Sequence, residues 1–209
     1  MTSTGEDLYY LTDNRTSSPD GVEQLTNIET LAFSDVEISL SDFYAIAEHW
    51  DSAKQTLSNG ATDGLLASAL ATSFSVQQSD VELQNLVKHL KADDFSDLPN
   101  IDSASATELS NASGVYVAST DTVYLNTNWL NTATDSAAEA VVLEELGHHF
   151  ETLLKTSDTP GDEGEHFSLL IRGLTPSSAE LSRIQADNDS LTLTIDAVTL
   201  SAEGSKGTA

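Results

Sequence analysis

The chain has 209 residues, of which 34 are acidic and 8 are basic, giving a formal net charge of −26 at pH 7. A surface of this charge repels nucleic acid, and no apolar run approaches the roughly 20 residues of a membrane span, so we expect neither nucleic-acid binding nor membrane insertion. Because the chain has no cysteine, any metal ion must be held by His, Asp and Glu side chains.

Residues 1–40 are predicted to be rich in β-strand. Short runs of Tyr, Phe, Val and Ile in DLYYLT and ETLAFSDVEISL lie on either side of the turn-forming NRTSSPDG. The words DGVEQLTNIETLAFSD, from Asp20 to Asp35, resemble the segment that closes the glycine-rich calcium repeats of RTX (haemolysin-type) secreted proteins, although the nonapeptide repeats themselves are missing. The resemblance implies secretion, whereas MTSTGEDLYY has neither the basic nor the apolar region of a signal peptide.

Residues 41–113 are predicted to be helical. The stretch SDFYAIAEHWDSAKQTL begins at a Ser-Asp cap, its apolar residues recur with the helical period, and we expect Asn59-Gly60 to end this helix. A second helical region spans about residues 62–92 and carries an apolar stripe from Val81 to Leu90.

Residues 114–200 mix strands and helices. GVYVASTDTVYLNTNWL, residues 114–130, alternates apolar and polar residues on both sides of Ser-Thr-Asp, which is typical of a β-hairpin. The longest predicted helix follows at residues 132–155, where Thr134 or Asp135 caps it and TSDTPGD breaks it.

The rest of the chain predicts two more helices and a strand or hairpin. EGEHFSLLIRGL opens a helix at Glu163, and TPSSAELSRIQAD opens another at Thr175-Pro176. SLTLTIDAVTL, residues 190–200, indicates a strand or hairpin, and the tail at residues 201–209 is expected to be disordered. Together these patterns predict an α+β fold that is mainly helical, with a small hairpin or sheet next to the longest helix.

The longest helix carries a variant of a zinc-site signature. In HExxH, two histidines on one helical face bind zinc, and the Glu after the first histidine polarises the bound water. In LEELGHHF, Glu144 takes the position of the first ligand, Glu145 that of the base and His148 that of the second ligand. Gly147 is expected where a neighbouring strand approaches closely. A carboxylate in place of imidazole lowers the charge at the metal and favours harder ions such as calcium or manganese.

A third ligand is expected from the start of the next helix. Asp162, Glu163, Glu165 and His166 follow the helix break, and helical spacing puts Glu163 and His166 on one face. We rank Glu163 first and His166 second, with Glu165 as a further alternative.

Four stretches look like parts of one domain of large secreted cyanobacterial proteins in the haemolysin-type calcium-binding group: VYLNTNWLNTAT, AVVLEELGHHFETLL, SDTPGDEGEHFSLLIRGL and DNDSLTLTIDAVTL. Members of the group similarly carry an LEEIGH-like word followed by DTPGDEGE. The likeness covers Gly114 to Leu200 and implies a zincin-like fold in a secreted protein. The matching positions are Glu144, Glu145, His148 and Glu163. His149 and His166 are particular to this chain.

The first functional hypothesis is a metallopeptidase. Glu144, His148 and Glu163 hold a divalent ion, most simply zinc, and Glu145 takes a proton from water that attacks the scissile carbonyl of a peptide or protein. The hairpin at residues 114–130 is expected to supply the edge strand that pairs with this substrate. Tyr116, Tyr124 or His166 would stabilise the oxyanion.

Three other hypotheses remain open. The domain is alternatively a non-catalytic, calcium-stabilised structural or adhesive module of a secreted protein, or its glutamates form only a solvated acidic face. The Glu-x-x-His pairs at residues 145–148 and 163–166 also suggest half of a ferritin-like di-iron site, with Glu48 or Glu82 supplying further ligands. The predicted strands argue against a pure helical bundle.

Overall fold

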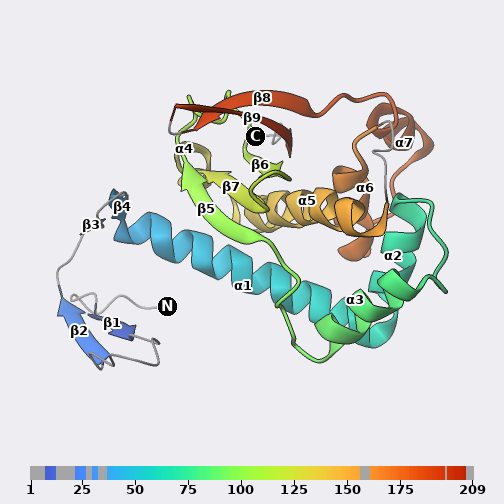
Figure 1. The fold of residues 1–209 in the computed structure, drawn as a ribbon, viewed down its shortest axis with the longest axis horizontal. Helices are drawn as coiled ribbons and strands as arrows, with labels where there is room; N and C mark the ends of the chain where they lie inside the picture. The colour runs from blue at the N-terminus through green and yellow to red at the C-terminus, as the bar shows by residue number, and fades with distance from the viewer. Residues whose placement is uncertain are drawn as a thin grey trace. The chain divides into compact units, whose positions relative to one another are not determined.

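The computed structural model describes residues 8–12, 22–26, 30–32, 37–155, 161–195 and 197–205. The chain divides into two compact units, Met1–Tyr44 and Ala45–Ala209. Their helices and strands confirm the α+β fold class (Figure 1). Among the described helices, none is long and apolar enough to span a membrane.

The first unit contains two short antiparallel strand pairs among its described residues. β1 (Leu8–Thr12) pairs with β2 (Val22–Thr26), and β3 (Thr30–Ala32) pairs with β4 (Glu37–Ser39). These strands confirm the strand-rich segment predicted for residues 1–40. The turn-forming NRTSSPDG and parts of the RTX-like stretch lie outside the described residues.

The second unit contains a mixed sheet of five strands among the described residues. In spatial order the strands are β5 (Asn100–Ala104), β7 (Thr122–Asn126), β6 (Gly114–Val117), β9 (Val198–Ser205) and β8 (Ser190–Ile195). β5 runs parallel to β7, and the other neighbouring strands are antiparallel. The hairpins predicted at residues 114–130 and 190–200 are confirmed as β6–β7 and β8–β9.

The β6–β7 hairpin lies inside the sheet and has no free edge. β6 pairs with β9 on its outer side, and β7 pairs with β5. The expectation that this hairpin supplies the edge strand for a substrate is therefore wrong, and the edge strands of this sheet are β5 and β8.

β6 has no free edge because β9 is longer than the sequence predicted and pairs with it. Ser201–Ser205, expected to belong to a disordered tail, form the second half of this strand, and Gly114 pairs with Ser205 across the ladder. The backbone N–H of Ser113 also donates to the carbonyl of Ser205 at 2.9 Å. Backbone pairing therefore orders a stretch whose composition does not predict a strand, and residues 206–209 lie outside the described residues.

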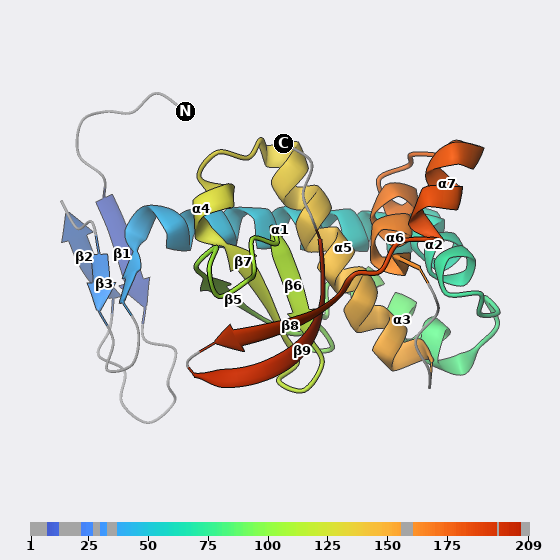
Figure 2. The same cartoon turned by 90° about the horizontal axis from the view of Figure 1, so that it is seen from above.

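The described residues form seven helices. They are α1 (Leu40–Asp63), α2 (Leu65–Ser73), α3 (Val81–Lys91), α4 (Thr127–Leu130), α5 (Asp135–Leu154), α6 (Glu163–Ile171) and α7 (Ser178–Ile184). α5 packs against β6 and β9 on one side and against α6 on another, as Figures 1 and 2 show. The sheet and α6 thus enclose α5, which makes it the central helix of the second unit.

The predicted end of α1 at Asn59-Gly60 is wrong. α1 continues to Asp63 and ends before Gly64, whose φ of +91° is the left-handed conformation that glycine tolerates. Gly60 lies inside the helix because α6 passes close by: a Cβ atom at position 60 would lie 2.6 Å from Cδ1 of Ile171. Tertiary packing here overrides a local turn signal.

The crossing of α5 and α6 depends on two glycines. A Cβ atom at Gly147 would lie 2.8 Å from Cα of Gly164, and one at Gly164 would lie 2.7 Å from the carbonyl oxygen of Glu144. The prediction of a close approach at Gly147 was correct in kind, but the neighbour is helix α6 and not a strand. Phe150 and Phe167 pack edge to face beside this crossing. The two helix backbones therefore come close enough for their polar side chains to share one site.

Candidate metal centre

Helix α5 buries an unusual number of ionisable side chains. It begins after Thr134, whose hydroxyl accepts a hydrogen bond from the N–H of Ala137, as a capping residue should. About three to four turns further on, the ionisable side chains of Glu145 and His148 are buried, with exposed fractions of 0% and 1%. Since a buried charge is costly unless it is paired, these residues need an explanation beyond solubility.

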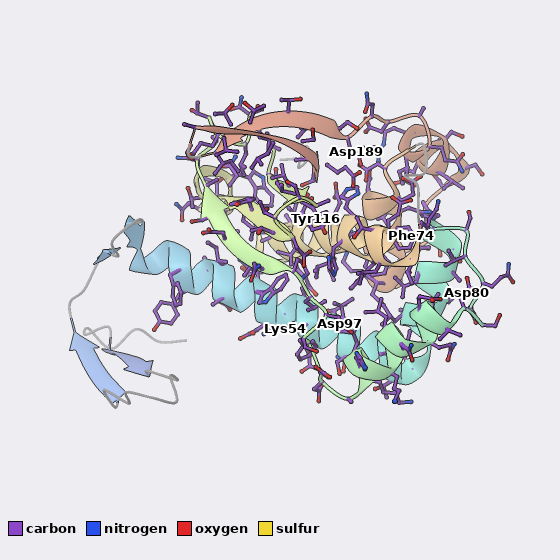
Figure 3. The ribbon with its side chains drawn as sticks, viewed as in Figure 1. Lys54, Phe74, Asp80, Asp97, Tyr116 and Asp189 are labelled. Carbon is purple, nitrogen blue, oxygen red and sulfur yellow. The ribbon has the colours of Figure 1, made fainter. Side chains whose placement is uncertain are left out.

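Three of the second unit's buried side chains converge. Nε2 of His148 lies 3.4 Å from Oδ2 of Asp189 and 3.9 Å from Oδ1 of Asp162, and one ligand atom from each residue lies within 4.8 Å of the others. His148 comes from α5, Asp162 caps the start of α6, and Asp189 lies in the connection between α7 and β8, where Figure 3 labels it. Imidazole and carboxylate are the ligand types for a divalent ion.

The orientation of the His148 ring is set by Glu203 of β9. Oε2 of Glu203 lies 3.2 Å from Nδ1 of His148, so a proton on Nδ1 leaves the lone pair of Nε2 directed at the two aspartates. A carboxylate in this position is a common second partner of metal-binding histidines. Nε2 itself has no hydrogen-bond partner among the described residues. Because Nε2 is buried and lies 3.4 Å from a carboxylate oxygen of Asp189, either a proton or a metal ion on this nitrogen would balance the nearby acids.

The residue of α6 that lies next to Nε2 has no side chain. A Cβ atom at Gly164 would lie 2.4 Å from Nε2 and 2.7 Å from Cε1 of His148, so a larger residue would occupy the space next to the nitrogen. Zinc binds histidine nitrogen at about 2.0–2.1 Å. The donor set and the nitrogen without a hydrogen bond together suit a small divalent cation.

The carboxylates of this region are hard to ionise without a cation. Burial raises the pKa of Asp189 to about 6, although His148 opposes the shift, and burial likewise raises the pKa of Asp162. Burial lowers the pKa of His148, but its hydrogen bond to Glu203 and the charges of Glu145, Glu203 and Asp162 outweigh burial and raise it well above the usual value. In the metal-free protein a proton on His148 balances the acids, and a metal ion would replace that proton.

The two adjacent glutamates of the EExxH word lie in different surroundings. Glu144 is half-buried and lines a pocket of about 540 Å³ together with Asp162 and Asp189. Burial, and then the charges of Asp162 and Glu145, raise the pKa of Glu144 well above its usual value. The structure places Glu144 beside the three-residue group and not inside it.

Glu145 faces the sheet and not this pocket. Its Oε1 accepts a hydrogen bond from the N–H of Ser205 at 3.1 Å, while Oε2 is buried and has no hydrogen-bond partner among the described residues. Burial raises its pKa to about 7, against the opposing effects of His148 and Ser205. A Cβ atom at Gly114 would lie 3.2 Å from Oε1, so β6 must approach closely for this carboxylate to fit.

Glu163 and His166 do not join the group. The position of α6 that faces His148 is Gly164, and residues 163 and 166 lie about 100° and 200° around the helix from it. Glu163 is buried, with Oε1 only 3.1 Å from the place of a Cβ atom on Gly161. His166 is half-buried, and burial lowers its pKa. Of the four ligands predicted from the sequence, the structure brings only His148 into the group and puts Glu144 next to it.

Sequence reasoning missed Asp189 and did not rank Asp162. Asp162 was visible as an acidic residue at the helix break, and its Oδ1 accepts the N–H of Glu165 as an N-cap. Asp189 stands before a strand in the word DNDS, which looks like an ordinary turn. It reaches His148 only because β8 and β9 join the sheet beside α5, a long-range pairing that no local pattern predicts.

The tyrosines proposed as oxyanion donors lie elsewhere. The hydroxyl of Tyr116 donates to Oδ1 of Asp121 at 3.0 Å and lies 3.2 Å from Nδ1 of His149, and burial raises its pKa to about 12. Nε2 of His149 also lies 2.8 Å from the carbonyl of Asp97, so this histidine is paired on both nitrogens. Tyr124 packs against the apolar core of the sheet. Neither tyrosine lines the pocket beside His148.

Comparison of the chain with protein-family models, with curated proteins and with solved structures gives no match. The likeness to secreted RTX proteins therefore stays an expectation, as does a secreted location. The functional conclusion rests on the geometry around His148.

Proposed function

We propose that the second unit binds a divalent cation through His148, Asp162 and Asp189 and uses it in hydrolysis within the adjoining pocket. The observation that carries this proposal is Nε2 of His148, which is buried, has no hydrogen-bond partner among the described residues and faces two carboxylates. Three protein ligands leave a coordination position for water, which is the pattern of catalytic zinc sites.

Zinc remains the ion that we expect first. Imidazole favours zinc, whereas the two carboxylates also suit manganese or calcium. A bound ion of this kind would act as a Lewis acid and lower the pKa of a water molecule. The chain would supply the rest: Glu203 holds the His148 ring, and the Asp162 cap ties the ion to α6.

We assign the proton-accepting role to Glu144 and keep Glu145 as the alternative. A general base must reach the reacting water, and Glu144 lines the pocket whereas Glu145 is anchored beneath it by the N–H of Ser205. The surroundings of Glu144 raise its pKa, which suits a group that takes up a proton. A peptide or protein remains the proposed substrate class, since the assignment of roles follows the metallopeptidase hypothesis.

A calcium-stabilised module is the second candidate. It is favoured by the origin of the ligands, because one ion would connect α5, the start of α6 and the segment before β8, which are far apart in the chain. Such a cross-link stabilises a fold with or without catalysis. The di-iron alternative has less support, because the second Glu-x-x-His pair lies outside the group and both Glu48 and Glu82 are exposed.

The experiment that separates these functions measures proteolysis of an unfolded protein such as reduced, alkylated casein. Zinc-loaded protein should cleave it, a chelator should stop the reaction, and Glu144→Gln should lower kcat by about 10²-fold or more while zinc content stays unchanged. If Glu145→Gln has this effect instead, the base is Glu145. Zinc-loaded protein that cleaves no substrate, but that calcium or zinc stabilises against unfolding, would overturn the hydrolase and support the structural module.

A further inference from the structure

The pocket beside His148 contains a guanidinium group that the reaction described above does not use. Only 8 of the 209 residues are Lys or Arg, yet both Arg172 and Arg183 line this one pocket. Arg183 is neutralised by ion pairs with Glu165 and, at 3.7 Å, with Asp187. Arg172 forms no ion pair within 4.0 Å among the described residues, although it is half-buried. Arg172 is influenced by the charges of Glu139, Glu144 and Glu165, but none of them forms a direct ion pair with it. The pocket therefore holds one guanidinium in direct ion pairs and one without a direct ion pair among the described residues.

Arg172 is held in place by its own helix. Its Nε–H donates to the carbonyl of Ser168 at 2.9 Å, one turn earlier on α6, and the hydroxyl of Ser168 in turn donates to the carbonyl of Ala140 on α5 at 2.7 Å. An arginine has five N–H donors, and the four on its two Nη atoms have no hydrogen-bond partner among the described residues. The hydrogen bond of Nε thus orients the plane of the guanidinium and leaves the N–H groups of the two Nη atoms available to bind a ligand.

The position of Arg172 relative to His148 follows from the geometry of α6. Gly164 touches His148, and Arg172 lies about 12 Å further along the helix axis. Helical side chains lean towards the N-terminus, and the bond to Ser168 shows this lean, so the guanidinium lies back towards the ion site. The lining of the pocket also includes small and apolar residues: Ala137, Ala140, Val141 and Leu169.

We propose that Arg172 binds a carboxylate of the substrate, so that the pocket selects chains with a free carboxylate within about three residues of the bond at the ion site. A planar carboxylate matches the two parallel N–H bonds of a guanidinium. A single negative charge also suits a pocket that already contains Glu144, Asp162 and Asp189, which would repel a doubly charged group more strongly. This inference rests on the proposed function because it names the substrate of the same site.

The test compares three peptides that differ in one charge. They are acetyl-Ala-Ala-Ala with a free carboxylate, the same peptide as its C-terminal amide, and acetyl-Ala-Glu-Ala amide. Binding is followed by the fluorescence of Trp129, which lines the pocket, in a Trp50→Phe background that removes the other of the two tryptophans, and is checked by calorimetry. Each protein is measured both zinc-loaded and chelator-treated, with its zinc content determined in the same sample.

We expect the free acid to bind at least about tenfold tighter than the amide, because hydrogen bonds to charged groups are the strong ones. Arg172→Gln should remove this preference and Arg172→Lys should retain part of it. Arg183→Gln should retain all of it and is the matched control, since it lines the same pocket with its charge already paired. If the Glu peptide binds as tightly as the free acid, the carboxylate of an acidic side chain is sufficient for binding. If the Glu peptide binds only as weakly as the amide, the site requires the carboxylate at the C-terminus of the peptide.

Equal affinities for acid and amide, a preference that survives Arg172→Gln, or no binding of any peptide would overturn the role of Arg172. These failures are distinct from failure of the proposed function. A sample that binds zinc but does not discriminate refutes only Arg172. A sample that holds no zinc, but whose acid preference disappears in Arg172→Gln, supports the role of Arg172 and refutes the ion.

Discussion

Gly164 of α6 faces Nε2 of His148 so closely that a Cβ atom there would lie 2.4 Å from the nitrogen. The same atom would lie 2.7 Å from the carbonyl oxygen of Glu144, which as part of the helix backbone has little freedom to move. Glycine at this position thus lets the two helices pack closely and keeps a side chain away from the imidazole nitrogen.

The first prediction is that Gly164→Ala weakens zinc binding and destabilises the protein. Overpacking of this kind typically costs about 1–3 kcal/mol, which exceeds the roughly 1 kcal/mol that Ala adds to an exposed helix over Gly. Zinc affinity and denaturant unfolding in chelator measure the two effects separately. The control is Gly173→Ala, where a Cβ atom would meet nothing within 4 Å, so only backbone strain at its positive φ is expected and zinc affinity should stay unchanged. Unchanged zinc affinity in Gly164→Ala would contradict the prediction.

The second prediction concerns Glu203, which reaches Nδ1 of His148 at 3.2 Å. Glu203→Ala should lower zinc affinity by about 10–100-fold, the usual effect of losing such a partner. Glu203→Gln should lose less, because an amide oxygen still accepts a hydrogen bond from Nδ1. Competition titrations with a coloured chelator give the affinities. Glu165→Gln, which removes a pocket carboxylate paired with Arg183, is the control, and an equal loss in that variant would show a general charge effect instead.

The third prediction is that the metal-free protein loses stability as pH rises from about 4 to 8. Burial raises the folded-state pKa of Asp189 to about 6 and that of Glu145 to about 7, so the folded state binds more protons than the unfolded state across this range. The raised pKa of His148 acts in the same direction, since its extra stability is present below the usual value of 6.5 and is lost as pH rises through the folded pKa.

Urea unfolding in excess chelator at pH 5 and pH 8 tests this, and the free energy of unfolding should be larger at pH 5. Saturating zinc should remove or reverse the difference, because the ion binds the deprotonated ligands. Greater stability of the metal-free protein at pH 8 would mean that these groups are not buried together.

Local patterns were sufficient for much of the fold. The β6–β7 hairpin, the cap of α5 at Thr134 and the opening of α6 at Glu163 are each determined by residues close in the chain, and the structure contains all three. The Ser177 cap of α7, reinforced by the side chain of Glu180, starts that helix slightly later than the Thr175-Pro176 signal indicates.

The failures all involve contacts between distant segments. Asn59-Gly60 reads as a turn, but Gly60 is required by Ile171 of α6. Ser201–Ser205 are too polar to predict a strand, yet they pair with β8 and β6 and bring Glu203 to His148. The close approach predicted at Gly147 is also found at Gly164. The sequence alone does not say which helix or strand lies next to such a glycine.

For the same reason the ligand set was only partly predictable. The spacing of Glu144 and His148 predicted the helix and one of the three residues of the candidate site. Glu163 was ranked first among the residues at the start of α6, but in the structure Gly164 faces His148, and Oδ1 of Asp162, the cap of the helix, lies 3.9 Å from Nε2 of His148. Asp189 depends on the position of β8 in the sheet, which is set by ladder pairing and not by the motif.

The most direct test of the ligand set is zinc affinity in two matched variants, Asp189→Asn and Glu163→Gln. Each replaces one buried carboxylate by its isosteric amide, so packing is nearly preserved and only the ligand character changes. The structure predicts that Asp189→Asn binds zinc at least about tenfold more weakly than the wild-type protein does. Glu163→Gln should bind zinc as tightly as the wild-type protein. Zinc binding that is lost in Glu163→Gln and kept in Asp189→Asn would contradict the site built on His148, Asp162 and Asp189.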